Sequence, residues 1–419
     1  KRYGFSEAEY ERVKASMIAN AESNVKALET KSNAEFIGDI QNDFFMGWPA
    51  STPQYTEQLL KDCFSVFNVD IINSMVSQMF SLDKNVVALY SAPAKEGAVH
   101  PTEAEVSAII ESISAMEIEN DVQEDIPSEL MNADELKGSK VVKEESGAFG
   151  STVWTLGNGV RVVLRPSDYN KEEITVNLDV PGGLSLVDDS DIASFDENFV
   201  VLYNAYAGLS DFPETMLMKI LAGKIVGTGL SFSDTHATIT GNAAPKDLET
   251  MLQMVYLTAV SPRFNEDEFA PAMNQLRTIV PNLEGTPDFA FGDHWYKTVY
   301  GNNPRMQQIN STKLGKMSLD VFARNYQKML GNFNGANFYI LGNYNPAEVK
   351  PLIEKYIGSL PSTSAKCAWK DRNVDVVKGN VQDVFEVTME TPKTTVGELV
   401  SANIEANVKN RIMMSFVQS

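Results

Sequence analysis

Histidine and cysteine are scarce in this sequence, and their scarcity limits the chemistry it can perform. The only three histidines are His100, His236 and His294, and no two of them are three or four residues apart, the spacing that places two ligands on one helix face. The two cysteines, Cys63 and Cys367, lie far apart and outside any C-x-x-C motif. The sequence therefore indicates neither a disulfide framework nor a cysteine-based metal or redox site.

Positive charge is also in short supply. The chain has 35 basic and 56 acidic residues, a formal net charge of -21. Such a charge repels phosphate backbones and anionic lipid headgroups, so we expect no nucleic-acid partner. No run approaches the about 20 apolar residues of a membrane-spanning helix, so we expect no membrane span. A helical pattern, and no signal peptide, follows residues 1–5, which leaves two alternatives: a cytosolic protein, or an export signal upstream of this sequence.

The first region, residues 1–97, is predicted to be mostly helical. Ser6 and Glu9 form a capping box in front of a long amphipathic pattern, and further helical patterns cover residues 56–67 and 70–80. Residues 85–90 read NVVALY, which predicts one short buried strand. One strand cannot make a sheet, so this region is interpreted as the back part of an α/β domain whose other strands are missing or supplied elsewhere.

Residues 98–150 are predicted to form a helix and an acidic linker. Thr102 and Glu105 make a second capping box. From residue 117 to residue 145 there are ten acidic residues, three lysines and no aromatic residue. This composition favours an extended linker.

Residues 151–361 are predicted to form one compact α+β domain, with a mixed or antiparallel sheet packed by helices. Strand patterns occur at its start and end, and helical patterns dominate its middle. The predicted strands are residues 160–164, 174–180, 235–241 and 337–341; the predicted helices are residues 196–206, 213–222, 245–260, 266–280, 288–300, 318–330 and a last one that begins at Pro346 and closes near residue 357. The glycine-rich residues 223–229 lack the P-loop pattern and are interpreted as a turn between a helix and a strand.

Residues 362–419 are predicted to be a linker and the beginning of a last, incomplete α/β domain. Residues 384–389 and 394–404 are strand candidates, and a helix is expected over residues 408–417. About sixty residues are too few to complete a domain of this kind.

Several short motifs in this order resemble the pitrilysin/insulinase family of zinc metallopeptidases, specifically its four-domain bacterial members similar to processing peptidases. The first strand of the family's third domain resembles TLGNGVRVVL at residues 155–164, and the strand end before its catalytic-type helix resembles PGGLSL at residues 181–186. Matching segments follow at residues 244–249, 300–305 and 341–344. The resemblance covers essentially the whole chain.

The resemblance implies that the zinc motif is degenerate here. An active half carries H-x-x-E-H, in which two histidines one helical turn apart bind zinc and the glutamate serves as general base, while a further glutamate on a later helix completes the coordination. Aligning residues 204–208 with the segment that follows this motif places Phe199 and Tyr203 at the histidine positions and Leu202 at the glutamate position. Phenylalanine and leucine offer no donor atom. We therefore expect no catalytic residue, no metal ligand and no cofactor in this chain.

By resemblance, the chain is the non-catalytic half of a zinc-dependent endopeptidase and helps to form an enclosed peptide-binding chamber. The implied partners are peptide substrates and the active N-terminal half of the same protein, which would hold the zinc. The implied location is the bacterial periplasm, the cell envelope or the cytoplasm. The alternative is a non-enzymatic binding or assembly subunit of the core-protein type; residual hydrolysis at an unrelated metal site is a third reading.

Overall fold

A seven-stranded mixed sheet organises the larger part of the chain. The computed structural model describes residues 3–79, 86–92, 97, 99–120, 125–389 and 391–418. The strands are β1 (Val141–Ser146), β2 (Thr152–Leu156), β3 (Arg161–Pro166), β4 (Ile174–Pro181), β5 (Val226–Phe232), β6 (His236–Ala243) and β7 (Asn337–Gly342). Their order across the sheet is β1-β2-β3-β7-β4-β6-β5, and of these pairs β3 and β7 alone run parallel. The α+β prediction is confirmed.

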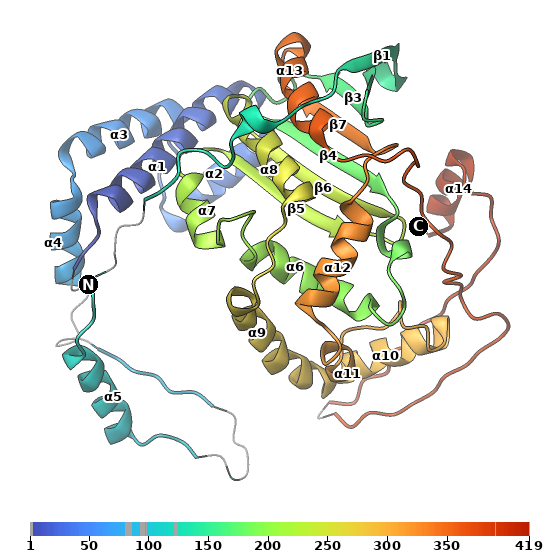
Figure 1. The fold of residues 1–419 in the computed structure, drawn as a ribbon. Coiled ribbons are helices and arrows are strands. Elements are labelled where there is room, and N and C mark those ends of the chain that lie inside the picture. The colour runs from blue at the N-terminus through green and yellow to red at the C-terminus, as the bar shows by residue number, and fades with distance from the viewer. Residues whose placement is uncertain are drawn as a thin grey trace.

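Helices cover one face of this sheet because alternate strand residues are apolar. Ile174, Val176, Leu178 and Val180 of β4 are fully buried, while the residues between them are less buried. The helices of this domain are α6 (Glu197–Tyr206), α7 (Glu214–Ile220), α8 (Leu248–Val260), α9 (Glu266–Glu284), α10 (Pro287–Tyr300), α11 (Ser311–Leu314), α12 (Leu319–Leu330) and α13 (Pro346–Tyr356). Figure 1 shows α8 and α12 lying across the front of the sheet. Pro346 occupies the first turn of α13, as predicted.

The N-terminal region is helical, as predicted. It contains α1 (Glu7–Ala27), α2 (Asn33–Met46), α3 (Pro53–Val66), α4 (Val69–Met79) and α5 (Glu103–Ala115). Both predicted capping boxes are formed, with the hydroxyl oxygens of Ser6 and Thr102 accepting from the backbone N–H groups of Glu9 and Glu105. α1 meets the sheet domain where the backbone N–H of Gly223 donates to the Ser16 hydroxyl over 3.0 Å. An ion pair between Glu29 and Lys171 adds a second link.

Strand predictions in two regions of the chain, before and after the sheet domain, are wrong. Residue 85 lies outside the described residues, and residues 86–90 form no strand, with Val87 and Leu89 more than nine-tenths exposed. Residues 384–389 and 394–404 likewise form no strand, and Val384 is 91% exposed. A β-prone segment becomes a strand only when another strand satisfies its backbone. No described strand lies beside either segment. The predicted C-terminal helix is present as α14 (Val408–Gln418).

The acidic segment is not a linker throughout. Residues 121–124 lie outside the described residues, but Leu130 is buried and residues 141–146 form β1, the outer strand beside β2. An acidic side chain of β1 stabilises the pairing with β2, because the Trp154 indole N–H donates to Glu144 over 3.0 Å. Charge composition alone therefore misassigned residues 141–146, because an edge strand tolerates charged side chains. The domain boundaries themselves stay predictions.

The segment compared with a single family strand at residues 155–164 contains a hairpin. β2 ends at Leu156 and β3 begins at Arg161, with Asn158 and Gly159 in the turn between them. Gly159 has φ +85°, and a Cβ atom there would lie 2.3 Å from the Asn334 side-chain oxygen. Only glycine fits this turn without strain.

Candidate functional site

The helix predicted to correspond to the zinc-binding helix is α6, and the segment between β4 and α6 positions it. After β4, Gly182 (φ +136°) and Gly183 (φ +49°) lead into a short 3-10 helix at Gly183–Leu186, and a Cβ atom on Gly183 would lie 2.4 Å from the backbone of His236. Glycine at these two positions permits a backbone conformation that other residues rarely adopt. Asp196 then caps α6 by accepting from the N–H of Asn198, and its other oxygen pairs with Lys313 over 2.7 Å in a largely buried position.

Phe199 and Tyr203 both face inward from α6. Phe199 is fully buried and Tyr203 is 6% exposed. The two residues are four positions apart, so they lie on the same helix face. Leu202 is only partly buried and packs against the margin of the main core. All three side chains thus act as packing groups.

Rings from four other elements close around this face. The ring centroid of Phe199 lies 5.0 Å from that of Phe269 on α9, and that of Tyr203 lies 4.7 Å from that of Phe322 on α12. The aromatic cluster, as we call it, consists of Phe195, Phe199, Tyr203, Phe232, Phe264, Phe269, Phe322 and Tyr326. Centroid separations of 4.7–6.4 Å within it are those of favourable edge-on and tilted ring contacts.

The chemistry of the aromatic cluster does not suit a metal ion. Phenylalanine rings supply no ligand atom, and burial raises the pKa of the Tyr203 hydroxyl far above its ordinary value, so this group stays neutral. Burial does the same for Tyr326, whose hydroxyl donates to the backbone oxygen of Thr258. The carboxylate nearest in sequence to Phe269 is that of Glu268. It accepts hydrogen bonds from Nε and Nη2 of Arg263, and these bonds lower its pKa.

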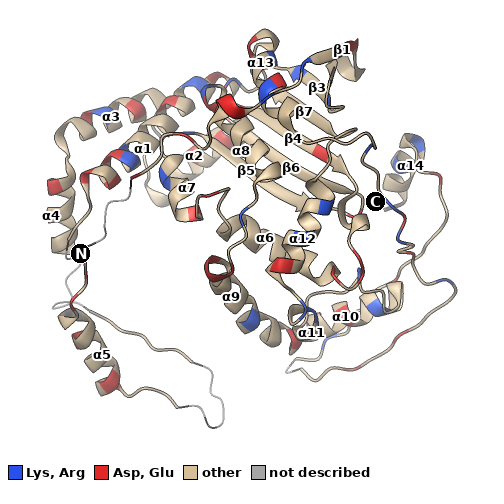
Figure 2. Cartoon of the chain, in the orientation of Figure 1, with Lys and Arg blue, Asp and Glu red and all other residues tan. Residues whose placement is uncertain are grey.

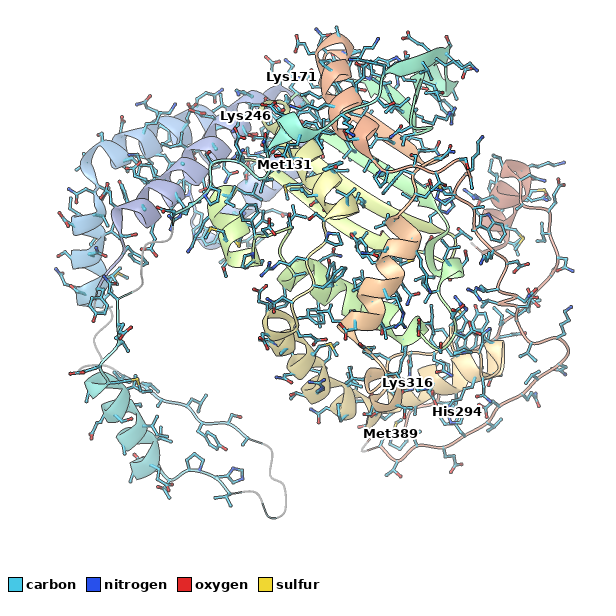
Figure 3. All side chains as sticks on the ribbon, viewed as in Figure 1. Met131, Lys171, Lys246, His294, Lys316 and Met389 are labelled. Carbon is cyan, nitrogen blue, oxygen red and sulfur yellow. The ribbon has the colours of Figure 1, made fainter. Side chains whose placement is uncertain are left out.

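The three histidines lie in separate places. His100 contacts the hydroxyl of Tyr90 at 3.2 Å, and His236 contacts the hydroxyl of Thr235 at 2.9 Å. His294 lies on α10 close to the C-terminal segment (Figure 3), 2.6 Å from a carboxylate oxygen of Asp383. Within the described ranges, no three His, Cys, Asp or Glu residues gather as a metal site would require.

Sequence reasoning missed the partners of Phe199 and Tyr203. Phe269 and Phe322 belong to helices that were predicted, but their role was not. The available signal was their place on the apolar faces of residues 266–280 and 318–330. That signal says that a side chain is buried but does not say against what.

The loop at residues 300–305 anchors the turn before α6. The Arg305 guanidinium donates to the backbone oxygens of Leu184 and Val187 and pairs with Asp189 over 2.7 Å. Its side chain is only 5% exposed despite its charge. Arg305 therefore anchors the turn after β4 to this loop.

Other predicted features are positioned as follows. Of residues 223–229, interpreted from the sequence as a turn, only residues 223–225 lie between α7 and β5, whereas residues 226–229 belong to β5 itself. Cys63 and Cys367 are free thiols. In the described part of the chain, no helix combines the length and apolarity needed to cross a bilayer. Figure 2 shows charge spread along α1 and α3, whereas α6 carries a single charged residue, Glu197, at its start.

Comparisons with known proteins agree on the fold. No family model matches the sequence. A zinc protease PQQL-like protein of Arabidopsis thaliana is 22% identical over 366 residues, which make up 86% of this chain and 35% of that protein. Two crystal structures match with 90% of this chain and 41% of theirs: the periplasmic protease PqqL from Escherichia coli (TM-score 0.53, 18% identity) and a variant of the ferredoxin protease FusC in complex with Arabidopsis ferredoxin (TM-score 0.54, 15% identity).

The chain has the pitrilysin/insulinase fold. The resemblance stated from the motifs is thereby confirmed, and the chain is related to the zinc proteases of this family. It spans less than half the length of the relatives it matches. α6 is the first α-helix after β4, and its correspondence to the zinc-binding helix of the family stays a prediction.

Proposed function

We propose that this chain is the non-catalytic half of a zinc-dependent endopeptidase and forms part of the wall of its peptide-binding chamber. The observation that carries the proposal is the packing of Phe199 and Tyr203. Both occupy positions aligned with zinc-binding histidines, and both are built into the aromatic cluster. A side chain fixed in this way can neither bind a metal nor activate water.

The partner helix supports the same proposal. In an active half, a glutamate on a later helix completes the zinc site. Here the helix packed against α6 is α9, and it presents Phe269 to Phe199. Ring contacts contribute about 0.5–1.5 kcal/mol each beyond area burial, so they can hold the two helices together where an active half uses a metal.

Hydrolysis would then depend on the other half of the full-length protein, which would supply the zinc and its ligands. Phe199, Leu202 and Tyr203 do not fit a zinc ion, and no catalytic step is assigned to them. The chain would contribute shape, a polar sheet surface and the exclusion of water and of bulky folded substrates. Peptides would be the substrates, a class consistent with a related protease crystallised with a protein bound to it.

Metal analysis and turnover of the purified chain test the proposal. We expect no stoichiometric zinc by atomic emission, and no cleavage of a quenched fluorescent peptide that a chelator abolishes. Stoichiometric zinc with chelator-sensitive turnover would overturn it. The core-type alternative is tested on the full-length protein, which would then be inactive as well.

A further inference from the structure

At one edge of the sheet, β5 is bordered by helices and not by another described strand. β5 is the last strand on its side, and no described strand pairs with its outer edge. The backbone N–H of Ala244 donates to the oxygen of Ile225 over 3.0 Å, so Ile225 and every second residue after it face β6. By alternation, Thr228 and Leu230 direct their backbone N–H and C=O groups outward. Such an edge is a template for an additional strand.

A single side chain occupies the pairing groups of Leu230. The Asn204 carboxamide N–H donates to the Leu230 oxygen over 2.7 Å, and the Leu230 N–H donates to the carboxamide oxygen over 3.2 Å. A carboxamide offers one donor direction and one acceptor, as a peptide group does. Asn204 therefore makes the two hydrogen bonds that one residue of an added strand would make.

The edge beside Asn204 is hollow. A cavity of about 110 Å³ is bordered by Asn204, Thr228, Gly229 and Leu230 together with residues of α7 and α8. The Asn204 carboxamide thus holds the pairing groups of Leu230, while Thr228 borders the cavity.

Asn204 comes directly after Tyr203 on α6. A step of one residue turns the helix by about 100°, so the same turn directs Tyr203 into the aromatic cluster and Asn204 toward β5. The segment aligned with the family's metal-binding turn thus performs two packing tasks here.

We infer that Asn204 seals the β5 edge against backbone pairing with an extended peptide, so that this half does not hold substrate by strand addition. The inference rests on the proposed function, because a seal matters only where the edge borders peptide substrates. Backbone pairing would then be confined to the other half, which makes Asn204 a determinant of where a substrate is held.

Hydrogen exchange and peptide binding test the seal in the intact chain. The probe is a short, fluorescently labelled peptide of alternating threonine and valine, and the control peptide carries N-methyl groups along one pairing edge. In the wild type, the Leu230 amide should be protected and the probe should bind weakly. In Asn204→Ala, the Leu230 amide should exchange faster, and the probe should bind about tenfold more tightly and restore its protection. The N-methylated peptide should neither bind more tightly to Asn204→Ala nor restore the protection of the Leu230 amide.

Asn198→Ala is the matched control, because Asn198 is exposed on the same helix and bonds only to Asp196. Its exchange and binding should equal those of the wild type. Equal probe binding by the wild type and a folded Asn204→Ala variant, or protection that appears away from β5, would overturn the inference. The assay requires no turnover, so its failure is separate from failure of the proposed function.

Discussion

The ring of Phe199 on α6 meets the ring of Phe269 on α9 nearly edge-on, with centroids 5.0 Å apart and planes at 62°. The two residues are seventy positions apart, and both are buried. The contact joins the helix aligned with the zinc motif to a helix that comes later in the chain. Under the proposed function, this contact keeps the helix arrangement of the fold without a zinc site.

Truncating this contact should destabilise the domain. Phe269→Ala removes a fully enclosed ring and leaves a cavity, so we expect a loss of about 3–5 kcal/mol in the free energy of unfolding. Urea denaturation followed by circular dichroism measures it. Val201→Ala, at a position 58% exposed on α6, serves as the control and should change stability little. A loss below about 1 kcal/mol for Phe269→Ala would contradict a supporting role for the ring.

The ion pair between Lys313 and Asp196 should hold the start of α6. Both side chains are nearly buried, so Lys313→Met leaves an uncompensated carboxylate and should cost about 3 kcal/mol at neutral pH. Replacing both residues, as Asp196→Asn with Lys313→Met, should recover part of that loss. A double-mutant cycle by urea denaturation gives the coupling. Additive single effects would show that the two side chains act independently.

Stability should fall in alkaline solution. Burial raises the pKa of Tyr203 and Tyr326 above the unfolded value of about 10, so the folded state keeps these protons when the unfolded chain loses them. The contribution is complete below about pH 10 and is lost as the pH rises above it. Melting temperatures between neutral and strongly alkaline pH should show the fall, and Tyr203→Phe should reduce its slope. An unchanged slope in this variant would exclude Tyr203 as a cause.

His294 should hold the C-terminal segment against α10. Its ring stacks on Phe385 with centroids 3.8 Å apart, and Asp383 accepts from Thr298 over 3.2 Å in addition to contacting His294. His294→Ala should therefore expose this segment and speed trypsin cleavage after Lys378 and Lys393. His100→Ala, far from α10 in sequence, is the control.

The contact between His294 and Asp383 should weaken at low pH. The contact with His294 lowers the pKa of Asp383 below its unfolded value of about 4, so its stabilising effect is present above that value and is lost as the pH falls through the lowered pKa. Cleavage by an acid-active protease should accelerate over that range in the wild type. In Asp383→Asn it should be fast throughout; a wild-type profile in this variant would count against the contact.

Local features of the fold were predictable because they depend on neighbouring residues. The capping boxes at Ser6 and Thr102 and the first-turn Pro346 are formed as their sequence patterns indicate. The strand candidates at residues 384–389 and 394–404 failed because β propensity supplies no partner strand. β1 was missed because its charged residues resemble a linker in composition, whereas its pairing with β2 stabilises it as a strand.

The candidate site was predictable in part for a related reason. Alignment proposed Phe199 and Tyr203 for the histidine positions, and residue type alone shows that Phe199 has no ligand atom and that Tyr203 has only a hydroxyl group. The contacts with Phe269 and Phe322, and the bonds from Asn204 to Leu230, join segments that only three-dimensional packing brings together. No spacing rule along one sequence encodes such pairs.

Reconstitution of the two halves tests whether this chain is the non-catalytic half. The two halves of the full-length protein would be expressed separately, and cleavage of a quenched fluorescent peptide would be measured for each half and for their equimolar mixture. We expect this chain alone to be inactive and to hold no zinc, and we expect its addition to the other half to raise chelator-sensitive turnover. Zinc-dependent turnover by this chain alone, or a mixture no more active than the other half by itself, would contradict it.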